Sequence, residues 1–338
     1  MGVDLGDIFE RNEIEFSDLK GKVIAIDAYN TLYQFLSIIR QRDGTPLIDS
    51  HGEITSHLSG FLYRTTNLIE EGIKPVFVFD GTPPEFKNKI IEERKKIRAN
   101  AQEKWDEAKA RGEDEEAFKH AQASSRIQGN MIEDAKLLLK AMGIPVIQAP
   151  SEGEAQASSI VRDGKAYAVG SQDYDALLFG APVVVRNLAV TGKRKLAGKS
   201  IFLEVKPELI ELEKGLDALG ISREQLVDIA LLVGTDYNDG IKGIGPRKAL
   251  KLIKKHTGIE AVLLELKTEI KNLTEIKNLF LNPPVTSEYE IKWKKPDPEA
   301  IMKFLCDDHD FSQARVSKAV ERLLDASDEG QKTLDKWF

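Results

Sequence analysis

The segment Gln148–Gly180, which reads QAPSEGEAQASSIVRDGKAYAVGSQDYDALLFG, contains two close pairs of carboxylates. Glu152 and Glu154 open a helical pattern, and Asp173 and Asp175 follow a short apolar run, AYAVG. Such a run is typical of a strand buried on both faces of a parallel sheet, and open α/β sheets form their active sites beyond the carboxyl ends of the strands. The segment therefore predicts an α/β fold with acidic side chains gathered at one edge of its sheet.

Two other apolar runs carry an aspartate at the same end. Residues 22–28 read KVIAIDA and include Asp27, and the run KPVFVFD ends on Asp80. A further strand is predicted at GIPVIQAP, directly before the first acidic pair, and Asp236 follows the apolar helical pattern 222–233. Because the carboxyl ends of parallel strands meet at one edge, we expect six carboxylates near one point, where Asp236 could join them.

Each carboxylate alone has a simpler explanation, because an acid after a strand often stabilises the start of the next helix. This alternative is strongest for Glu152 and Glu154, which lie in the first turn of a helix predicted over 151–163 with Ser151 as its cap. Six or seven negative charges, however, do not share a pocket without counter-charge. Either several are protonated or divalent cations are present.

The chemical type of the predicted ligands indicates which metal ion the site would bind. All of them are carboxylates, and none of the five histidines falls in these motifs, which disfavours zinc and favours Mg²⁺ or Mn²⁺. Two such ions about 4 Å apart stabilise both the attacking and the leaving oxygen in phosphoryl displacement. The pattern therefore predicts a phosphodiester-cutting site without a protein nucleophile.

The composition describes an intracellular globular chain. The 338 residues are 41% apolar, and no apolar run approaches the length of a membrane span. The N-terminus lacks a signal-peptide pattern, and the single cysteine, Cys306, excludes a disulfide framework and a cysteine-based zinc site. The net charge of −7 argues only weakly against a nucleic-acid binder, because a metal-binding acidic cluster lowers it without making the whole surface acidic.

One segment between the predicted strands differs from the rest of the chain in its composition. Residues 85–120 are highly charged and poor in apolar residues, which is typical of a solvated helix or a mobile element, so we expect them to project from the core. Further on, TGKRKLAGKS predicts a basic turn and SIFLEV an edge strand. From residue 207 the chain is expected to be helical, with two later helical patterns over 259–280 and 297–325.

Five sequence blocks together resemble the structure-specific 5′ nucleases, and in detail the flap endonucleases of archaeal and eukaryotic replication. The blocks are IDAYNTLYQF, VFVFDGTPP, APSEGEAQA, GSQDYD and GTDYN, in the family's order and spacing, and the resemblance runs from Gly2 to Phe338. It implies a PIN-like nuclease core with a mostly parallel central sheet flanked by helices. It also implies a charged helical arch and a helix–two-turn–helix DNA-binding motif.

The resemblance implies a division of the chain. Residues 1–98 would form the N-terminal part of the nuclease core, 99–115 the remainder of the arch, 116–258 the internal part of the core with the helix–two-turn–helix, 259–329 a C-terminal helical segment, and 330–338 a tail that binds the sliding clamp. Because the chain ends directly after this tail, an archaeal-type enzyme is expected.

The resemblance also assigns the catalytic residues. The ligands of two Mg²⁺ ions per subunit, for which Mn²⁺ can substitute, are matched by Asp27, Asp80, Glu152, Glu154, Asp173, Asp175 and Asp236. The catalytic lysine and arginine of the arch are matched by Lys87 and Arg94. Seven residues are two helical turns, so both would point the same way and suit a scissile phosphate. From the sequence alone, a solvated basic face explains this pair at least as well.

Further matches concern DNA. Tyr33 matches the tyrosine that stacks on the base beside the cut, although a core aromatic is as good an interpretation of its spacing. Arg40 and Arg64 match positions near the duplex. The helix–two-turn–helix contributes Lys242, Gly243, Gly245, Arg247 and Lys248, within a basic run that continues through Lys251, Lys254 and Lys255. Its glycines would allow a phosphate or a monovalent cation to approach the backbone; a glycine-rich turn before an amphipathic helix is the alternative.

The tail QKTLDKWF resembles the peptide that binds the sliding clamp, PCNA, through Gln331, Leu334, Trp337 and Phe338. The resemblance implies a monomer that removes 5′ flaps by endonuclease and 5′–3′ exonuclease cleavage during replication and repair. It also implies that the protein acts in the cytoplasm at the nucleoid and without a membrane. Two alternatives stay open. One is a related exonuclease or repair nuclease of the same superfamily, and the other is a non-catalytic, clamp-associated DNA-binding scaffold.

Overall fold

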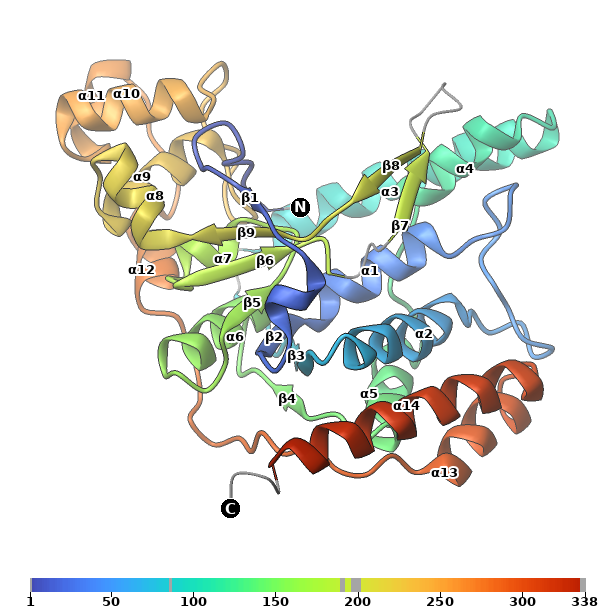
Figure 1. Cartoon of the computed structure of the whole chain (residues 1–338). Helices are drawn as coiled ribbons and strands as arrows, with labels where there is room; N and C mark the ends of the chain where they lie inside the picture. Colours follow the sequence, from blue (N-terminus) through green and yellow to red (C-terminus); the bar gives the residue numbers. More distant parts are fainter. Residues whose placement is uncertain (1, 85–86, 189–191, 196–201, 335–338) are drawn as a thin grey trace.

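The computed structural model describes residues 2–84, 87–188, 192–195 and 202–334 (Figure 1). Its centre is a seven-stranded sheet with the spatial order β1-β9-β6-β5-β2-β3-β4. The parallel strands are β6 (Val183–Arg186), β5 (Ala168–Gly170), β2 (Val23–Asp27), β3 (Lys74–Phe79) and β4 (Val146–Gln148). Antiparallel β9 (Glu208–Glu211) and β1 (Asn12–Glu13) extend one edge. The expected mostly parallel sheet is confirmed.

Alternate residues of the central strands serve opposite faces of the sheet. On β2, Ile24 and Ile26 belong to the hydrophobic cluster of α1 (Ala28–Ile38), α2 (Ser56–Glu70) and α5 (Met131–Ala141). Ala25 belongs to the other cluster, with α6 (Gly153–Arg162), α7 (Asp175–Leu178) and α9 (Arg223–Val233). Since neighbouring residues of a strand point to opposite faces and helices cover both, the strand sequences are almost wholly apolar.

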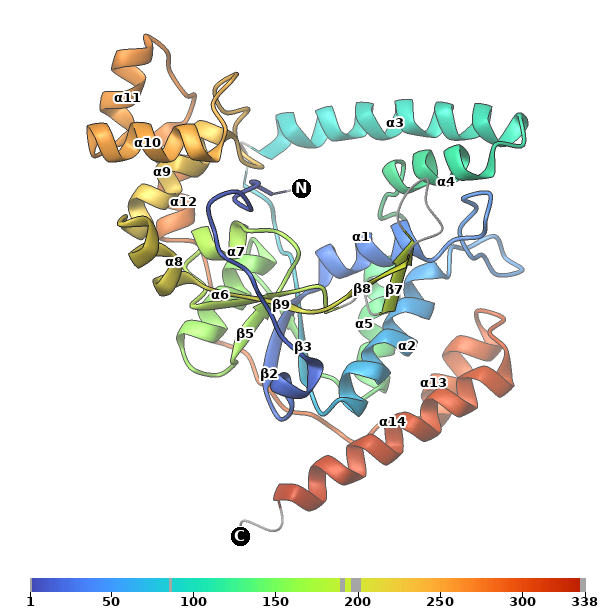
Figure 2. The same ribbon diagram turned by 45° about the horizontal axis from the view of Figure 1, so that its top comes forward.

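Helices α3 (Asn88–Ala110) and α4 (Asp114–Ala123) form the projection expected of the charged segment, and we call this pair the helical arch. Figure 2 shows α3 crossing above the body of the protein, with α4 folded back under its far end. The two helices pack mainly on each other, and α4 returns the chain towards α1.

The other helices lie at two separate places (Figure 1). One group gathers beyond the β6–β9 side and comprises α8 (Leu212–Leu219), α9, α10 (Pro246–His256), α11 (Ile259–Leu266) and α12 (Leu273–Leu281). The other comprises α13 (Pro298–Met302), a π-helical turn (Lys303–Asp307) and α14 (Gln313–Leu334), which packs on α2. A short 3-10 helix, η1 (Phe16–Leu19), precedes β2. Within the described ranges, no helix has the length and apolar character needed to cross a membrane.

Several expectations about local structure are wrong. The predicted basic turn contains a strand, β7 (Gly192–Lys195), rather than a turn at these residues. The expected edge strand SIFLEV does contain a strand, β8 (Phe202–Val205), which pairs with β7 in a separate two-stranded sheet. The chain after residue 207 first forms β9, because pairing with β6 overrides a weak local pattern. The single helix expected over 259–280 is divided, since Lys267 and Asn272 take positive φ angles of 52° and 55°.

Candidate active site

The first two carboxylates stand where the central parallel strands end. Asp27 is the last residue of β2 and the N-cap of α1, and its Oδ1 accepts a hydrogen bond from the Asn30 amide at 3.0 Å. Asp80 follows β3, and its Oδ1 accepts from the Gly153 amide at 2.7 Å, which joins it to the start of α6. The helix-start explanation is therefore true of Asp27, but its carboxylate also faces the other acids.

Glu152 and Glu154 do not use their side chains to cap a helix. Helix α6 begins at Gly153 with Glu152 as its N-cap residue, so the expected Ser151 cap is wrong, and no side-chain capping bond is present. Both oxygens of Glu152 accept from Lys87 Nζ, at 2.9 and 2.7 Å. Glu154 Oε1 accepts from the Ser171 hydroxyl at 2.5 Å. Both carboxylates are thus turned away from the helix end.

Asp173 and Asp175 complete the group from the segment after β5. Asp173 Oδ2 accepts from Asn30 Nδ2 at 3.0 Å, and Asp175 Oδ1 accepts from the Val3 amide at 2.9 Å. The N-terminal segment is therefore part of the site. Gly2 approaches so closely that a Cβ atom on it would lie 2.4 Å from Asp175 Oδ1, which only glycine avoids.

Four of the acidic side chains have raised pKa values, and neighbouring carboxylates are among the causes. Burial raises the pKa of Asp27 well above its usual value, and Asp80 and Asp173 raise it further. Burial also raises the pKa of Asp80 to about 6, with Glu152 as the next cause. Like charges and desolvation both disfavour ionised carboxylates. These side chains therefore share one weakly solvated region rather than separate surface positions.

The remaining acids belong to the same region. Burial raises the pKa of Glu154, followed by the charges of Asp27 and Asp175. Burial likewise raises the pKa of Asp175, and the next cause is Asp236, which comes from the loop after α9. All the predicted ligands are connected in this way, so the structure brings together Asp27, Asp80, Glu152, Glu154, Asp173, Asp175 and Asp236.

The base of the arch supplies two cations. Lys87 pairs with Glu152 and Arg94 pairs with Asp236, and the lysine side chain is only 14% exposed. Burial alone lowers the pKa of Lys87, but Glu152, Asp80 and Asp236 outweigh it and raise the pKa. Two cations against seven carboxylates leave a large excess of negative charge.

The donor set fits hard divalent cations, because every candidate ligand is a carboxylate oxygen. As the side chains stand, no three Asp, Glu, His or Cys side chains of the described residues converge closely enough to hold an ion. Lys87 and Arg94 now neutralise one carboxylate each, so ligation by Glu152 and Asp236 requires these cations to turn aside. The carboxylates therefore suit divalent cations in charge and in donor type, but their present positions do not form a complete coordination site.

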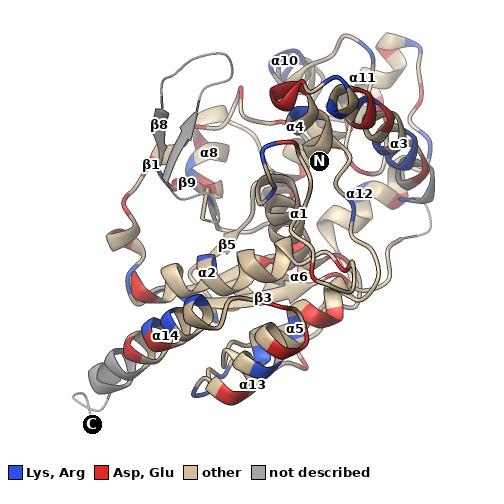
Figure 3. Cartoon of the chain, turned by 90° about the vertical axis from the view of Figure 1, so that its right-hand side faces the viewer, with Lys and Arg blue, Asp and Glu red and all other residues tan. Residues whose placement is uncertain are grey.

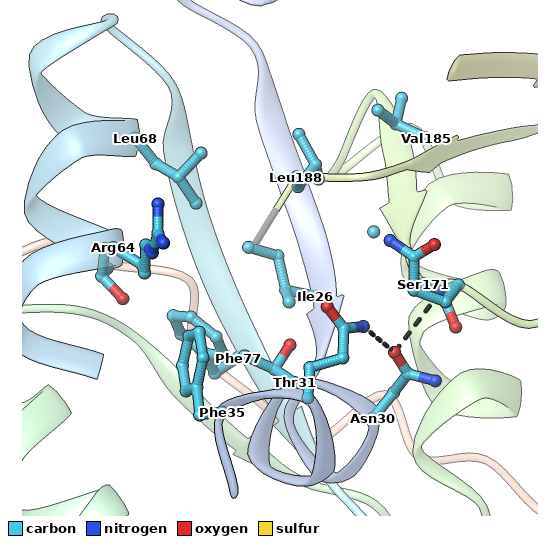
Figure 4. A pocket seen from close by; sticks show the side chains of 14 residues that line it. Ile26, Asn30, Thr31, Phe35, Arg64, Leu68, Phe77, Ser171, Val185 and Leu188 are labelled. Carbon is cyan, nitrogen blue, oxygen red and sulfur yellow. Dashed lines mark hydrogen bonds between the residues drawn. The ribbon is translucent and has the colours of Figure 1, made fainter. Parts of the chain in front are cut away.

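Three further residues expected near the DNA come from α1, from the segment directly after it and from α2. Tyr33 on α1 is half-buried, and the Arg98 guanidinium of the arch lies 5.1 Å above its ring. Arg40 donates to the Leu36 and Gly44 carbonyls and to Ser125, and burial lowers its pKa. Arg64 lines a cavity of about 20 Å³ between α1, α2 and β5 (Figure 4).

The helix–two-turn–helix presents the expected basic surface. All six of its predicted basic residues are exposed, namely Lys242, Arg247, Lys248, Lys251, Lys254 and Lys255. Two of them also have partners: Lys254 donates to the Leu219 carbonyl and Lys255 pairs with Glu265. Gly243 has a φ angle of 81°, which favours glycine, and Gly245 is the N-cap of α10. Figure 3 shows Lys and Arg positions in blue along α10 and α3.

The expected clamp peptide is described only in its backbone. Helix α14 continues to Leu334 and so includes Gln331, whereas Trp337 and Phe338 lie outside the described residues.

Within the site, sequence reasoning missed Asn30, Gln34 and Ser171, which hydrogen-bond to the carboxylates or to one another. The position of Asn30 three residues after Asp27, in the first turn of a helix, was the available signal.

Comparison with known proteins gives concordant matches. The XPG N-terminal domain matches residues 4–101 and the XPG I-region matches residues 143–236. The chain is 59% and 60% identical over 338 residues to the flap endonuclease 1 of Methanosarcina acetivorans and of Methanosarcina barkeri, with 100% of each chain covered. The solved flap endonuclease-1 from Methanococcus jannaschii matches with a TM-score of 0.77 and 46% identity, over 96% of this chain and 98% of that one.

Proposed function

The chain belongs to the flap endonuclease 1 family of structure-specific DNA nucleases, and from this membership we propose how its own residues cut a 5′ flap. It is a hydrolase that acts on branched DNA in replication and repair, and its family depends on divalent metal ions. Endonuclease cleavage of the flap and 5′–3′ exonuclease cleavage share one site. Each leaves a 5′-phosphate and a 3′-hydroxyl.

The observation that carries the proposal is the convergence of carboxylates from distant parts of the chain. They come from the ends of β2 and β3, the start of α6, the segment after β5 and the loop after α9. A buried excess of negative charge is costly unless cations offset it. Two Mg²⁺ ions per subunit, replaceable by Mn²⁺, satisfy this requirement with all seven carboxylates as the ligand set.

Lys87 and Arg94 are assigned to the scissile phosphate. When bound, divalent ions at such a site lower the pKa of water and offset the charge that develops on the phosphate. The ammonium and guanidinium groups already act as hydrogen-bond donors towards this point, and they would transfer to phosphate oxygens when DNA arrives. Arginine can hold a phosphate through two parallel hydrogen bonds, which fixes its orientation.

The duplex is assigned to the exposed basic turn before α10. Lys242, Arg247 and Lys248 would neutralise DNA phosphates, and Gly243 and Gly245 leave the backbone accessible to a phosphate or a monovalent cation. Tyr33 would stack on the base beside the cut once Arg98 leaves its ring. Arg64 and Arg40 are placed near the duplex, with Arg40 limited by the three bonds that it already makes.

The tail is assigned to the sliding clamp. Gln331, Leu334, Trp337 and Phe338 would occupy a partner's pocket, where buried aromatics supply most of the binding energy. The protein would act as a monomer on DNA at the nucleoid, in the cytoplasm. These assignments rest on the tail's sequence pattern and on family membership.

The central test removes one ligand. Asp173→Ala should lower cleavage of a 5′-flap duplex in Mg²⁺ by about 10²–10³-fold or more, because the site then lacks a carboxylate whose place no other side chain can take. The matched control is Asp217→Ala, which removes an exposed carboxylate on α8 and should cut at the normal rate. Equal cleavage by the Asp173 variant would refute the metal assignment.

The remaining alternatives are separated by substrate choice. A flap endonuclease should cut a 5′ flap faster than a nicked duplex or a bubble of the same sequence. Preference for nicks or bubbles would favour a related exonuclease or repair nuclease. Absence of any metal-dependent cutting by the wild-type protein would favour a non-catalytic scaffold.

A further inference from the structure

Asn30 is the side chain that connects two of the acidic segments without carrying a charge. It lies in the first turn of α1, directly after β2, and is half-buried. Its backbone amide donates to Asp27 Oδ1 at 3.0 Å, and its Nδ2 donates to Asp173 Oδ2 at 3.0 Å. Asp27 and Asp173 follow the neighbouring parallel strands β2 and β5. Asn30 is therefore a direct hydrogen-bonded link between these two carboxylates.

The carboxamide of Asn30 is held in one orientation. Its Oδ1 accepts hydrogen bonds from Gln34 Nε2, one helical turn further along, and from the Gln172 amide at 3.4 Å (dashed lines in Figure 4). A flipped Asn30 would turn its oxygen towards Asp173 and its NH₂ towards two donors, so both sets of bonds would be lost. The hydrogen bonds from Gln34 and the Gln172 amide therefore keep the NH₂ group of Asn30, and not its oxygen, directed towards Asp173.

A neutral donor suits this position better than a cation. Lys87 and Arg94 neutralise Glu152 and Asp236, so each competes with a metal ion for its carboxylate. Asn30 uses one lone pair of Asp173 and leaves the negative charge of the carboxylate intact. Hydrogen-bonded partners of this kind fix the direction in which a ligand presents its remaining oxygen lone pairs.

We propose that Asn30 is a positioning residue, which orients the Asp173 carboxylate relative to Asp27 for metal binding, and that Gln34 acts through it. The proposal deepens the proposed function and rests on the metal site assigned there. Loss of such partners typically costs 10–100-fold in metal affinity. Asn30 itself touches no metal and no substrate in this role.

The test measures binding of Ca²⁺ and Mg²⁺ to the DNA-free protein by titration calorimetry, together with urea unfolding in EDTA. Asn30→Leu, which keeps the size but removes the amide, should weaken cation binding about 10-fold or more. Gln34→Leu should weaken it less, by about threefold, because Asn30 remains but is free to turn. In the double variant the Gln34 change should add nothing, since its effect passes through Asn30.

Thr31→Val is the matched control. Thr31 is the next residue of α1, is 5% exposed, and donates through its hydroxyl to the Asp27 carbonyl at 2.7 Å rather than to any carboxylate. It should lower the urea midpoint without changing cation affinity. A cation affinity for Asn30→Leu within twofold of wild type, or additive effects in the double variant, would overturn the positioning role.

The titration also keeps this inference separate from the proposed function. If the wild-type protein and Asp173→Ala bind cations equally, the metal site itself is wrong. If Asp173→Ala loses binding while Asn30→Leu and Gln34→Leu keep it, the metal site stands and Asn30 does not position it. Should Asn30→Leu fail to fold, Gln34→Leu alone decides the question, because Gln34 donates its hydrogen bond to Asn30 and not to a carboxylate.

Discussion

At the scale of single residues, the partners of the carboxylates divide into charged and neutral ones. Lys87 and Arg94 cancel charge at Glu152 and Asp236, whereas Asn30, Ser171 and the Val3 amide only orient their partners. The charged partners belong to the arch and the neutral ones to the body of the protein. Movement of α3 therefore changes the charge of the site, while the orientation of its other carboxylates is retained.

Lys87→Met tests the charged class. Cleavage at saturating Mg²⁺ should fall about 10²–10³-fold, because a donor to the reacting phosphate is lost. The affinity for Mg²⁺ without DNA should stay equal or tighten, since the ammonium no longer competes for Glu152. Single-turnover cleavage and calorimetry measure the two effects. Lys104→Met, an exposed lysine on the same helix, should change neither, and weaker Mg²⁺ binding by Lys87→Met would contradict this account.

His57 predicts a specific dependence of stability on pH. It is 1% exposed, and burial lowers its pKa to about 3, helped by the nearby charge of His309. The unfolded chain takes up a proton at this histidine below about pH 6.5, whereas the folded chain stays neutral there, so stability falls as the pH falls below that value. His57 should cost about 2 kcal/mol of unfolding free energy between pH 7.5 and 5.

Urea unfolding at several pH values checks this cost. The difference in pH slope between wild type and His57→Leu isolates the histidine, because the other titrating groups are common to both proteins. His51→Leu, which removes an exposed histidine from the turn before α2, should keep the wild-type slope. An unchanged slope in His57→Leu would show that burial does not hold this ring neutral.

The sequence could predict the carboxylates but not their partners. Asp27, Asp80, Asp173 and Asp175 follow apolar runs, and the ends of parallel strands are spatially close wherever the sheet order places them. Asn30, Gln34 and Ser171 are harder to recognise, because a neutral side chain in a helix or after a strand is as common on the surface. The role of Asn30 depends on a contact with Asp173, which lies 143 residues further along the chain.

At the scale of elements, the arch is attached at both ends. Its base is held by Lys87 and Arg94, and its far end by Trp105, whose Nε1 donates to the Asp43 carbonyl at 2.8 Å. Lys109 pairs with the Asp43 carboxylate at 2.9 Å and lowers the pKa of that carboxylate to about 2. Opening of the arch therefore requires separation at two distinct contacts.

Trp105→Phe should loosen only the far contact. It keeps an aromatic ring but loses the buried hydrogen bond, so amides of α4 and of the second half of α3 should exchange with solvent about 10-fold faster. Amides of the central sheet should be unchanged. Trp293→Phe, which removes an equivalent indole bond to the Pro75 carbonyl away from the arch, is the control. Equal exchange in α4 of both variants would contradict the two-point attachment.

Elements could be predicted from the sequence where burial is strong. The central strands are recognisable because both faces of the sheet are covered, but β9 contains two glutamates and β7 reads GKRK, so neither has an apolar pattern. Both form because a partner strand satisfies their backbone groups, which a local pattern does not reveal. The charged segment was correctly expected to leave the core, yet its division into α3 and α4 was not expected.

At the scale of the whole molecule, the net charge conceals opposite local charges. The acidic site gathers carboxylates mainly from the ends of the central strands, whereas the exposed basic residues lie in the turn before α10 and at the start of that helix, and the formal charge of −7 averages over both. Arguments about nucleic-acid binding thus depend on distribution rather than on the sum. Here the distribution supplies both a region for cations and a surface for phosphate.

Deletion of residues 331–338 tests the tail at this scale. Flap cleavage without the clamp should be unchanged, because the deleted residues include none of the predicted metal ligands, whereas stimulation by the clamp should be lost. Rates with and without clamp measure both effects. The double substitution Trp337→Ala and Phe338→Ala keeps the chain length and should act like the deletion. Stimulation that survives both changes would locate the clamp contact elsewhere.

The topology has a consequence for how the protein is made. The Val3 amide bonds to Asp175, and β1 pairs with β9 through Asn12 and Leu209, so the N-terminal segment finds its place only after most of the chain exists. Asp236 is synthesised later still, after β9. A nascent chain emerging from the ribosome therefore passes through most of its synthesis without a complete nuclease site, and the cell is not exposed to a half-made enzyme able to cut DNA.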